Sequence, residues 1–250
     1  TRKESSAASD VYKRQGPFTF VKRVRGERIE LARNPDYWGG PPHLSGVVFR
    51  PLPDVSARTA ALRSGDVDIV AVPNPDSVRN LVSEGYTLSE GRPPHVWYLS
   101  FNMRDPIMAH KEVRQAINLA IDRDGMARDL LRGTVNPAYG VQAPANSAYV
   151  ERTDAYARNL DKARELLRQA GYPDGFTTTL TTSVDGSGQI IPSQMAEYLQ
   201  QNLADVGIDL KVDTQEWISY LGTWAQGAQK GVGMAQMSCC LLYTSDAADD

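Results

Sequence analysis

Side chains able to hold a metal ion are thinly spread along this chain. The three histidines, His43, His95 and His110, lie far apart, and none has a partner at helical spacing. Asp122 and Asp124 have the spacing that opens a calcium loop, but the later ligands and the closing Glu are missing. Helix capping explains Asp122 more simply. The sequence therefore predicts no metal site and no cofactor.

Ser187 is the residue that comes nearest to a catalytic motif. It lies in Gly186-Ser187-Gly188, without the strand-turn-helix context and the spacing of a nucleophile elbow. The histidines suggest no catalytic triad, and no phosphate-binding glycine loop is present. We therefore expect a flexible loop at Ser187 and a protein that is not an enzyme. A fragment of an α/β hydrolase is the less favoured alternative.

The most suggestive local feature is an aromatic cluster with polar neighbours. Trp97, Tyr98 and Phe101 are followed by Asn102 and Arg104. Aromatic side chains beside an amide on one extended segment can line a binding cleft. The competing interpretation, favoured by periodicity alone, is a buried strand whose Asn102 completes a turn. The residues themselves leave both interpretations open.

The elements that must position these residues follow a mixed α/β pattern. Alternating apolar residues predict strands near residues 18–20, 29–31, 47–49, 67–72, 95–102, 176–180 and 208–214. Apolar residues at helical spacing predict helices near residues 54–65, 76–82, 113–121, 122–133, 161–170 and 196–206. Short strands that alternate with amphipathic helices indicate an α/β fold.

Charge and cysteine content exclude some classes of protein. The 250 residues carry 27 Lys and Arg against 30 Asp and Glu, a net charge of −3, so there is no broad basic field for nucleic acid. The sequence contains no run of 18 consecutive apolar residues, which is about the length that a membrane-spanning helix needs. The two cysteines, Cys239 and Cys240, are adjacent, which excludes a disulfide framework.

The two ends of the chain look foreign to its middle. Residues 5–15 translate a DNA string that resembles a transposase adapter used in sequencing libraries. The reverse complement of that string, read in another frame, encodes residues 240–250. Two ordinary polar tails would have to be complementary by accident. We therefore expect residues 1–15 and 239–250 to be adapter-derived, and a signal peptide to have been lost by truncation.

Four collinear blocks of sequence carry a family resemblance. Residues 33–70, 98–126, 159–180 and 195–221, preceded by a Gly-Pro-Phe turn at residues 16–18, resemble the bacterial extracellular solute-binding proteins of family 5. These are receptors for oligopeptides, dipeptides and nickel in ABC importers. The resemblance covers nearly all of residues 16–238.

The resemblance implies a periplasmic-binding-protein-like fold of the class II type, with two lobes that close around a solute by a hinge motion. Residues 16–100 would be part of the first lobe and residues 101–238 part of the second, so the fold would be incomplete. The segment near residues 97–102 would cross between the lobes. The cleft would then be bordered by Tyr98, Phe101, Asn102 and Arg104, which we predict to bind ligand.

The function implied is capture of a peptide or similar small solute and its delivery to a membrane permease. A receptor of the same fold for a nickel chelate or a sugar is the alternative. The resemblance also implies a monomer that is periplasmic or extracellular, anchored as a lipoprotein in some hosts. Two departures from the family pattern leave specificity open. Residues 107–110 replace a more usual run, and Cys239 stands where family members often carry Trp.

Overall fold

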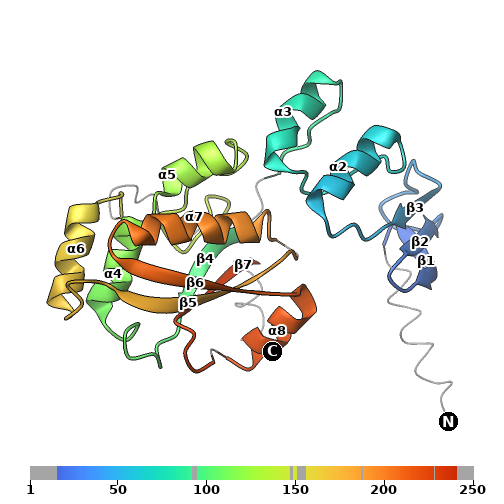
Figure 1. Cartoon of the computed structure of the whole chain (residues 1–250). Helices are drawn as coiled ribbons and strands as arrows, with labels where there is room; N and C mark the ends of the chain where they lie inside the picture. Colours follow the sequence, from blue (N-terminus) through green and yellow to red (C-terminus); the bar gives the residue numbers. More distant parts are fainter. Residues whose placement is uncertain are drawn as a thin grey trace, which may run out of the picture. The chain divides into compact units, whose positions relative to one another are not determined.

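The computed structural model describes residues 16–91, 95–146, 149–150, 156–186, 188–227 and 229–240 (Figure 1). The chain divides into two compact units, residues 1–53 and 54–250. The predicted lobe boundary at residue 100 stays a prediction.

The first unit is built on a three-stranded antiparallel sheet. Its strands are β1 (Phe18–Val24), β2 (Arg28–Arg33) and β3 (Gly46–Phe49), in the order β1-β2-β3. All three coincide with predicted strands. Asn34 follows β2, is buried, and donates from its amide to the carbonyl of Gly16 at 2.9 Å. That bond ties the end of β2 to the start of the described chain.

The second unit begins with two helices, α2 (Val55–Ser64) and α3 (Pro75–Ser83). The predicted caps of α2 are confirmed. The Asp54 carboxylate accepts from the backbone N–H of Ala57 at 2.6 Å, and Gly65 ends the helix in the left-handed region at φ 78°.

The strand predicted near residues 67–72 is wrong. Described residues 67–72 form bends and irregular backbone, the Ile69 side chain is 84% exposed, and Val72 has φ 51°. A residue in the left-handed region cannot continue an extended strand, and an apolar alternation without a neighbouring strand has nothing to pair with.

A four-stranded mixed sheet organises the rest of the second unit. Its strands are β4 (His95–Phe101), β5 (Phe176–Ser183), β6 (Ile208–Gln215) and β7 (Met234–Cys240), in the order β4-β7-β5-β6. β5 runs parallel to both β6 and β7, whereas β4 is antiparallel to β7. The central pair, β5 and β7, therefore joins segments that are far apart in the sequence.

Helices cover this sheet with a continuous apolar core. They are α4 (Lys111–Ala120), α5 (Arg123–Gly125), the π-helix η1 (Met126–Leu130), α6 (Leu160–Gln169), α7 (Pro192–Ala204) and α8 (Trp217–Ala225). Fully buried side chains of α4, α6 and α7 pack with Leu180 of β5 and Met234 of β7. The predicted break into two helices is confirmed, because α4 ends at Ala120 and Asp122 caps α5 by accepting from the N–H of Gly125 at 2.8 Å.

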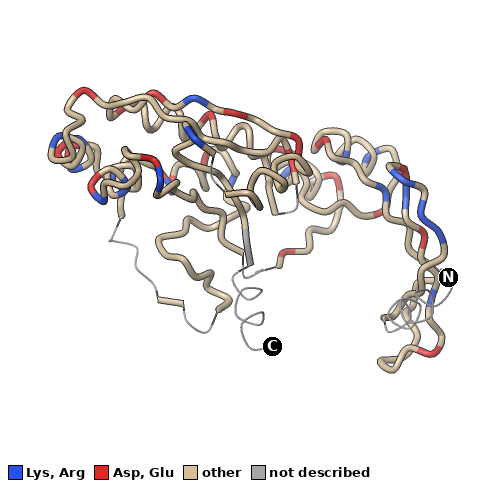
Figure 2. The backbone as a smooth tube through the Cα atoms, turned by 90° about the horizontal axis from the view of Figure 1, so that it is seen from below, with Lys and Arg blue, Asp and Glu red and all other residues tan. Residues whose placement is uncertain are grey.

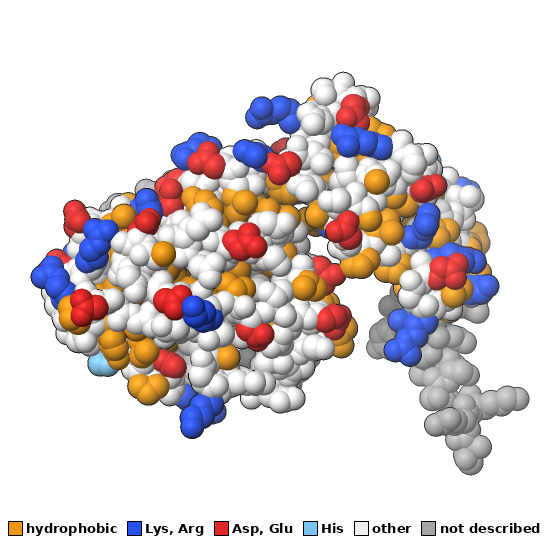
Figure 3. All heavy atoms as spheres, viewed as in Figure 1, with side chains coloured by type: hydrophobic (Ala, Val, Ile, Leu, Met, Phe, Trp, Pro, Cys, Tyr) orange, Lys and Arg blue, Asp and Glu red, His pale blue; other side chains and the backbone are white. Residues whose placement is uncertain are grey.

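Charged side chains of both signs are interspersed in each unit. Figure 2 shows acidic and basic positions interspersed along the backbone, and the face in Figure 3 carries both signs. The mixture of signs agrees with the small net charge of the sequence and differs from the broad basic surface that binds a polyanion. Within the described ranges, no helix combines the length and the apolar character needed to cross a membrane.

Candidate functional site

The carboxyl ends of three strands meet at one edge of the four-stranded sheet. β5 is parallel to β6 and to β7, so the three strands end on the same side. The antiparallel β4 begins there, with His95 opposite Cys240. Ligands of open α/β sheets bind just outside the carboxyl ends of the strands. This edge is therefore the first place to look for a site.

At this edge the sheet divides. β5 pairs with β6 as far as Ser183 opposite Gln215, and β7 pairs with β4 as far as Cys240. β5 and β7, however, are paired at only two positions, the later of which joins Thr181 to Ala235. Beyond this pair both strands continue, but they are no longer paired with each other. We call this region, residues 182–186 and 188–189 with residues 236–238, the divided edge.

Several buried polar atoms without a partner belong to residues of the divided edge, on both faces of the sheet, since Thr182 and Ser183 are consecutive residues of β5. The hydroxyls of Thr182 and Ser183, both side-chain polar atoms of Gln189 and the Oε1 of Gln236 have no hydrogen-bond partner among the described residues. Thr182, Ser183 and Gln236 are fully buried, and Gln189 is 4% exposed. Buried polar atoms are nearly always bonded in proteins. A group of unbonded ones marks a place where water or a ligand can complete them.

Gln236 is held in place by neighbours on both of its sides. Its Nε2 donates to the carbonyl of Pro192, the first residue of α7, at 3.2 Å. The Tyr220 hydroxyl of α8 donates to the backbone carbonyl of Gln236. Burial, with a smaller effect of Tyr98, raises the pKa of the Tyr220 phenol, so this hydroxyl remains a donor at neutral pH.

The loop that follows β5 approaches its neighbours so closely that it needs glycine. Gly186 has φ 130°, and a Cβ there would overlap the ring of Trp217. A Cβ at Gly188, φ 76°, would lie 2.9 Å from the Ser238 hydroxyl. The loop is therefore packed against β7 and α8 on either side of Ser187. Ser187 itself, predicted to lie in a flexible loop, is outside the described residues.

Two of the four predicted site residues lie on opposite faces of β4. Tyr98 and Phe101 are three positions apart, and successive side chains of a strand alternate between its faces. Phe101 packs against the apolar core together with Trp97. Tyr98 is half-buried and lies near enough to Tyr220 to affect the pKa of its phenol. The structure therefore does not bring these two aromatic side chains together.

The other two predicted residues, Asn102 and Arg104, belong to one turn after β4. The Asn102 amide donates to the carbonyl of Val232 at 2.8 Å, and its oxygen accepts from the backbone N–H of Arg104 at 3.1 Å. Asn102 is buried, and the Arg104 residue is exposed. Asn102 thus fastens the loop before β7 to the end of β4. Ligand binding by all four residues stays a prediction.

Sequence reasoning missed the polar residues of the divided edge. The sequence pattern marked residues 176–180 as a strand but did not single out Thr182, Gln189 or Gln236. One signal was available, because Thr182 and Ser183 end a strand rich in threonine that is buried despite its hydroxyls. Their burial depends on tertiary packing that spacing along the chain does not reveal.

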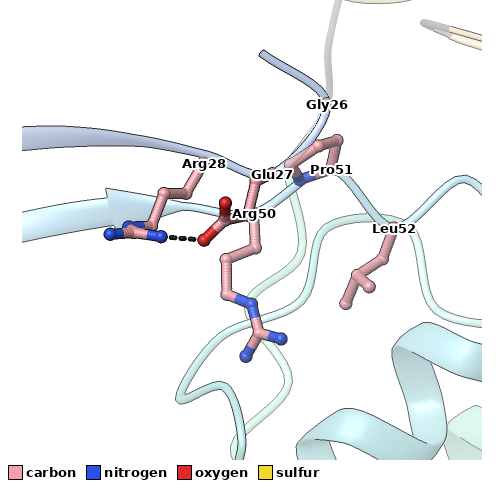
Figure 4. A pocket seen from close by; sticks show the side chains of 6 residues that line it. All are labelled: Gly26, Glu27, Arg28, Arg50, Pro51 and Leu52. Carbon is pink, nitrogen blue, oxygen red and sulfur yellow. Dashed lines mark hydrogen bonds and ion pairs between the residues drawn. The ribbon is translucent and has the colours of Figure 1, made fainter. Parts of the chain in front are cut away.

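Two hollows elsewhere are lined mainly by exposed or half-buried residues. One, of about 450 Å³, lies beside the β1–β2 turn and is lined by Gly26, Glu27, Arg28, Arg50, Pro51 and Leu52 (Figure 4). In it the Glu27 carboxylate pairs with the guanidinium of Arg28. The other, of about 650 Å³, is lined by Arg63, Glu84, Gly85 and Tyr86, and Arg63 forms two bonds of 2.9 and 2.7 Å to Glu84.

In each hollow an arginine and a glutamate already pair with each other, so these charges are not free to bind a ligand. Neither hollow is therefore as strong a candidate as the divided edge. Across the described part of the chain, no group of three or more His, Cys, Asp or Glu residues is placed to hold a metal ion.

Comparisons with known proteins agree on one family. Residues 8–238 match the family model described as "Bacterial extracellular solute-binding proteins, family 5 Middle". The dipeptide-binding protein of Escherichia coli is 30% identical over 221 residues, which are 88% of this chain and 41% of that protein. Heme-binding protein A of Haemophilus influenzae is 30% identical over 207 residues, 82% of this chain and 38% of that protein.

A solved structure agrees in shape as well as in sequence. The periplasmic binding protein DppA from Helicobacter pylori, in complex with the peptide STSA, superposes with a TM-score of 0.80 at 32% identity. The superposition covers 90% of this chain and 42% of that one. The chain thus spans about two fifths of the length of the relatives it matches.

Proposed function

Since this chain belongs to the bacterial extracellular solute-binding proteins of family 5, we propose that the full-length protein is the solute-binding component of an ABC importer. The predicted fold, a partial two-lobed periplasmic-binding-protein fold of the α/β class, is confirmed by the H. pylori relative. The observation that carries the function is the family match across residues 8–238.

The solute that we propose is a peptide. Two proteins at 30% identity or more support it, the dipeptide-binding protein of E. coli and the H. pylori protein bound to the peptide STSA. A nickel chelate or a sugar is the alternative solute within the same family.

We place the capture site at the divided edge. Tyr98 pairs with Met237 and lies on the face of the sheet opposite to the core-facing side chains of Leu99 and Gln236, so it is the one of the four predicted ligand residues that we propose contacts solute from that outer face. Phe101 contributes to the core, and Asn102 with Arg104 shapes the turn that supports β7. For these three residues we propose an indirect role in positioning the site.

Other features of the proposal follow from the family. Its members are solute-binding proteins, and we propose that this protein likewise catalyses no reaction, acts as a monomer and docks on a membrane permease. Its place is outside the cytoplasm, in the periplasm or, in some hosts, on the membrane as a lipoprotein.

Thermal denaturation of the full-length protein against a solute library tests the function. Di-, tri- and tetrapeptides, nickel with histidine, and simple sugars would be added separately. A ligand that binds only the folded state raises the melting temperature in a concentration-dependent way, and we expect this with peptides. If no solute shifts the melting temperature while an ester or amide substrate is turned over, the receptor function fails and the hydrolase alternative gains.

A further inference from the structure

We propose that the ion pair between Asp76 and Arg132 is a latch that favours the closed state of the full-length protein. This inference rests on the proposed function, and it names residues that bias the hinge motion rather than residues that touch the solute. Asp76 lies in the first turn of α3, and Arg132 follows the π-helix η1. The Nε of Arg132 donates to the Asp76 carboxylate at 2.5 Å.

The first reason is the position of the pair along the chain. The two residues are 56 positions apart, and the predicted lobe boundary at residue 100 falls between them. Both belong to the second compact unit. An opening motion about that boundary would separate the two charges, so the pair stabilises the state in which the predicted lobes are close together.

The second reason is the backbone at Arg132. Its φ of 53° lies in the left-handed region, which is uncommon for a residue with a side chain, and Gly133 follows with φ 74°. The N–H of Gly133 donates to the carbonyl of Ala127, six residues earlier, at 2.8 Å, so η1 ends in a wide turn. π-Helical turns and strained residues of this kind are frequent at functional and switch regions.

The third reason is that the acid beside Arg132 on its own segment is already occupied. Both carboxylate oxygens of Asp129 accept from the guanidinium of Arg128, at 2.8 and 2.6 Å. The hydrogen bond from Arg128, and to a smaller extent the charge of Arg132, lowers the pKa of Asp129. Since Asp129 is held by Arg128, Arg132 pairs with an acid on another helix.

The fourth reason is that the pair is exposed, which suits a reversible contact. The side chains of Arg132 and Asp76 are 55% and 63% exposed. Exposed ion pairs contribute little stability and are weakened further by salt. A receptor must open again to release its solute, so a weak contact can bias the hinge without locking it.

The experiment measures two quantities in the full-length protein. One is the affinity for the tetrapeptide Ser-Thr-Ser-Ala, determined by calorimetry at low and at high salt. The other is the distance between two spin labels in the absence of solute. The labels are attached at Asn80→Cys and Asn136→Cys, in a background without other cysteines. Both positions are exposed and each is four residues beyond one member of the pair, so the labels are close when the latch is formed.

The variants are Asp76→Asn, Arg132→Gln and the charge-swapped double variant Asp76→Arg with Arg132→Asp. Glu84→Gln is the matched control. It breaks the ion pair with Arg63, whose 2.7 Å distance and 42% exposure resemble those of the latch, but both partners lie on one side of the predicted boundary.

We expect each single variant to weaken peptide binding by about threefold at low salt and to reduce the fraction of short label distances. The difference from the wild type should disappear at high salt, where the charges are screened. The charge-swapped variant should restore both quantities, and Glu84→Gln should leave both unchanged.

Several results would overturn the inference. Single variants that bind peptide as the wild type does and keep its label distances would show an incidental surface contact. A loss that the charge swap does not restore, or that Glu84→Gln shares, would show that the effect does not come from this pair. If the wild type binds no small peptide, the proposed function fails, while the label distances without solute still decide whether the latch exists.

Discussion

The Asn102 side chain uses both of its polar ends on the backbone, which makes its chemistry specific. Replacement by aspartate keeps the shape but removes the donor, and sets a carboxylate against the carbonyl of Val232. We expect Asn102→Asp to lower the free energy of unfolding by about 3 kcal/mol at neutral pH, since it buries an acceptor facing an acceptor. Urea denaturation of the full-length protein measures this loss.

Asn74→Asp is the matched control for that substitution. Asn74 caps α3 by accepting from the N–H of Asp76 at 3.0 Å, and an aspartate can accept in the same way. Its free energy of unfolding should change little. Equal losses for the two variants would show that the donor of Asn102 is unimportant.

Val72 is a β-branched residue in the left-handed region, where such side chains are strained. Asparagine tolerates that conformation better, so Val72→Asn should raise the free energy of unfolding by about 1 kcal/mol. Val82→Asn on α3, a residue 49% exposed against 44% for Val72, relieves no backbone strain, and valine and asparagine have similar helix propensities. In urea denaturation of the full-length protein, a higher midpoint for Val72→Asn but not for Val82→Asn would show that the backbone at Val72 is strained. A loss for both variants argues against it.

The amino-terminal cap of α8 is a carboxylate, Glu216, so the stability of this helix end should depend on pH. The Glu216 carboxylate accepts from the N–H groups of Ile218 at 2.9 Å and Ser219 at 3.1 Å, and these bonds lower its pKa. A pKa that is lower in the folded than in the unfolded protein means that the ionised Glu216 stabilises the fold. This contribution to the free energy of unfolding is complete above the unfolded pKa of about 4.5 and is lost as the pH falls through the lower pKa of the folded protein.

Glu216→Ala should therefore destabilise α8 at neutral pH, and its difference from the wild type should shrink at about pH 3.5. The fluorescence of Trp217 and Trp224, both on α8, reports the transition in urea. Glu216→Asp keeps a capping carboxylate and should retain the pH dependence of the wild type. A Glu216→Ala effect that is the same at both pH values would rule out capping by the charged group.

How far the sequence predicts these elements depends on the range of the interactions involved. The caps at Asp54 and Gly65 are correct because a cap is a contact among near neighbours in the chain. The strand near residues 67–72 is wrong because a strand needs a partner that periodicity alone cannot supply. The unpaired atoms of Gln189 and the unpaired oxygen of Gln236 were missed because the burial of these residues arises from segments brought together only by the fold.

At the scale of the whole molecule, large apolar side chains are exposed in both units. Trp38 is 86% exposed and Phe49 57% in the first unit, and Ile69 is 84% exposed in the second. Exposed apolar surface of this kind marks regions that other segments cover. We therefore expect residues 16–240 alone to unfold with poor cooperativity, while the full-length protein melts cooperatively.

Calorimetry checks that expectation by comparing the van't Hoff and calorimetric enthalpies of the two proteins. Binding of a dye specific for apolar surface should be stronger for the shorter protein. A sharp two-state melt of residues 16–240, with a large van't Hoff enthalpy, would contradict it.

The origin of the two ends is a separate prediction about the whole molecule. The family match stops at residue 238, where the second predicted tail begins, and starts at residue 8, inside the first predicted tail. Long-read sequencing of the locus should replace the codons of residues 1–15 and 239–250 by others. Codons continuous with the genome at both ends would refute the adapter origin.

The order of the strands also has a consequence for synthesis. β4 pairs along its whole length with β7, yet β5, α7 and β6 are all made between them, whereas β5 and β6 are separated by a single helix. Pairing β4 with β7 closes a loop of more than a hundred residues, which is slow, and it cannot be completed before residues near 240 have been synthesised. We therefore expect the pairing of β4 with β7 to form later during synthesis than the pairing of β5 with β6.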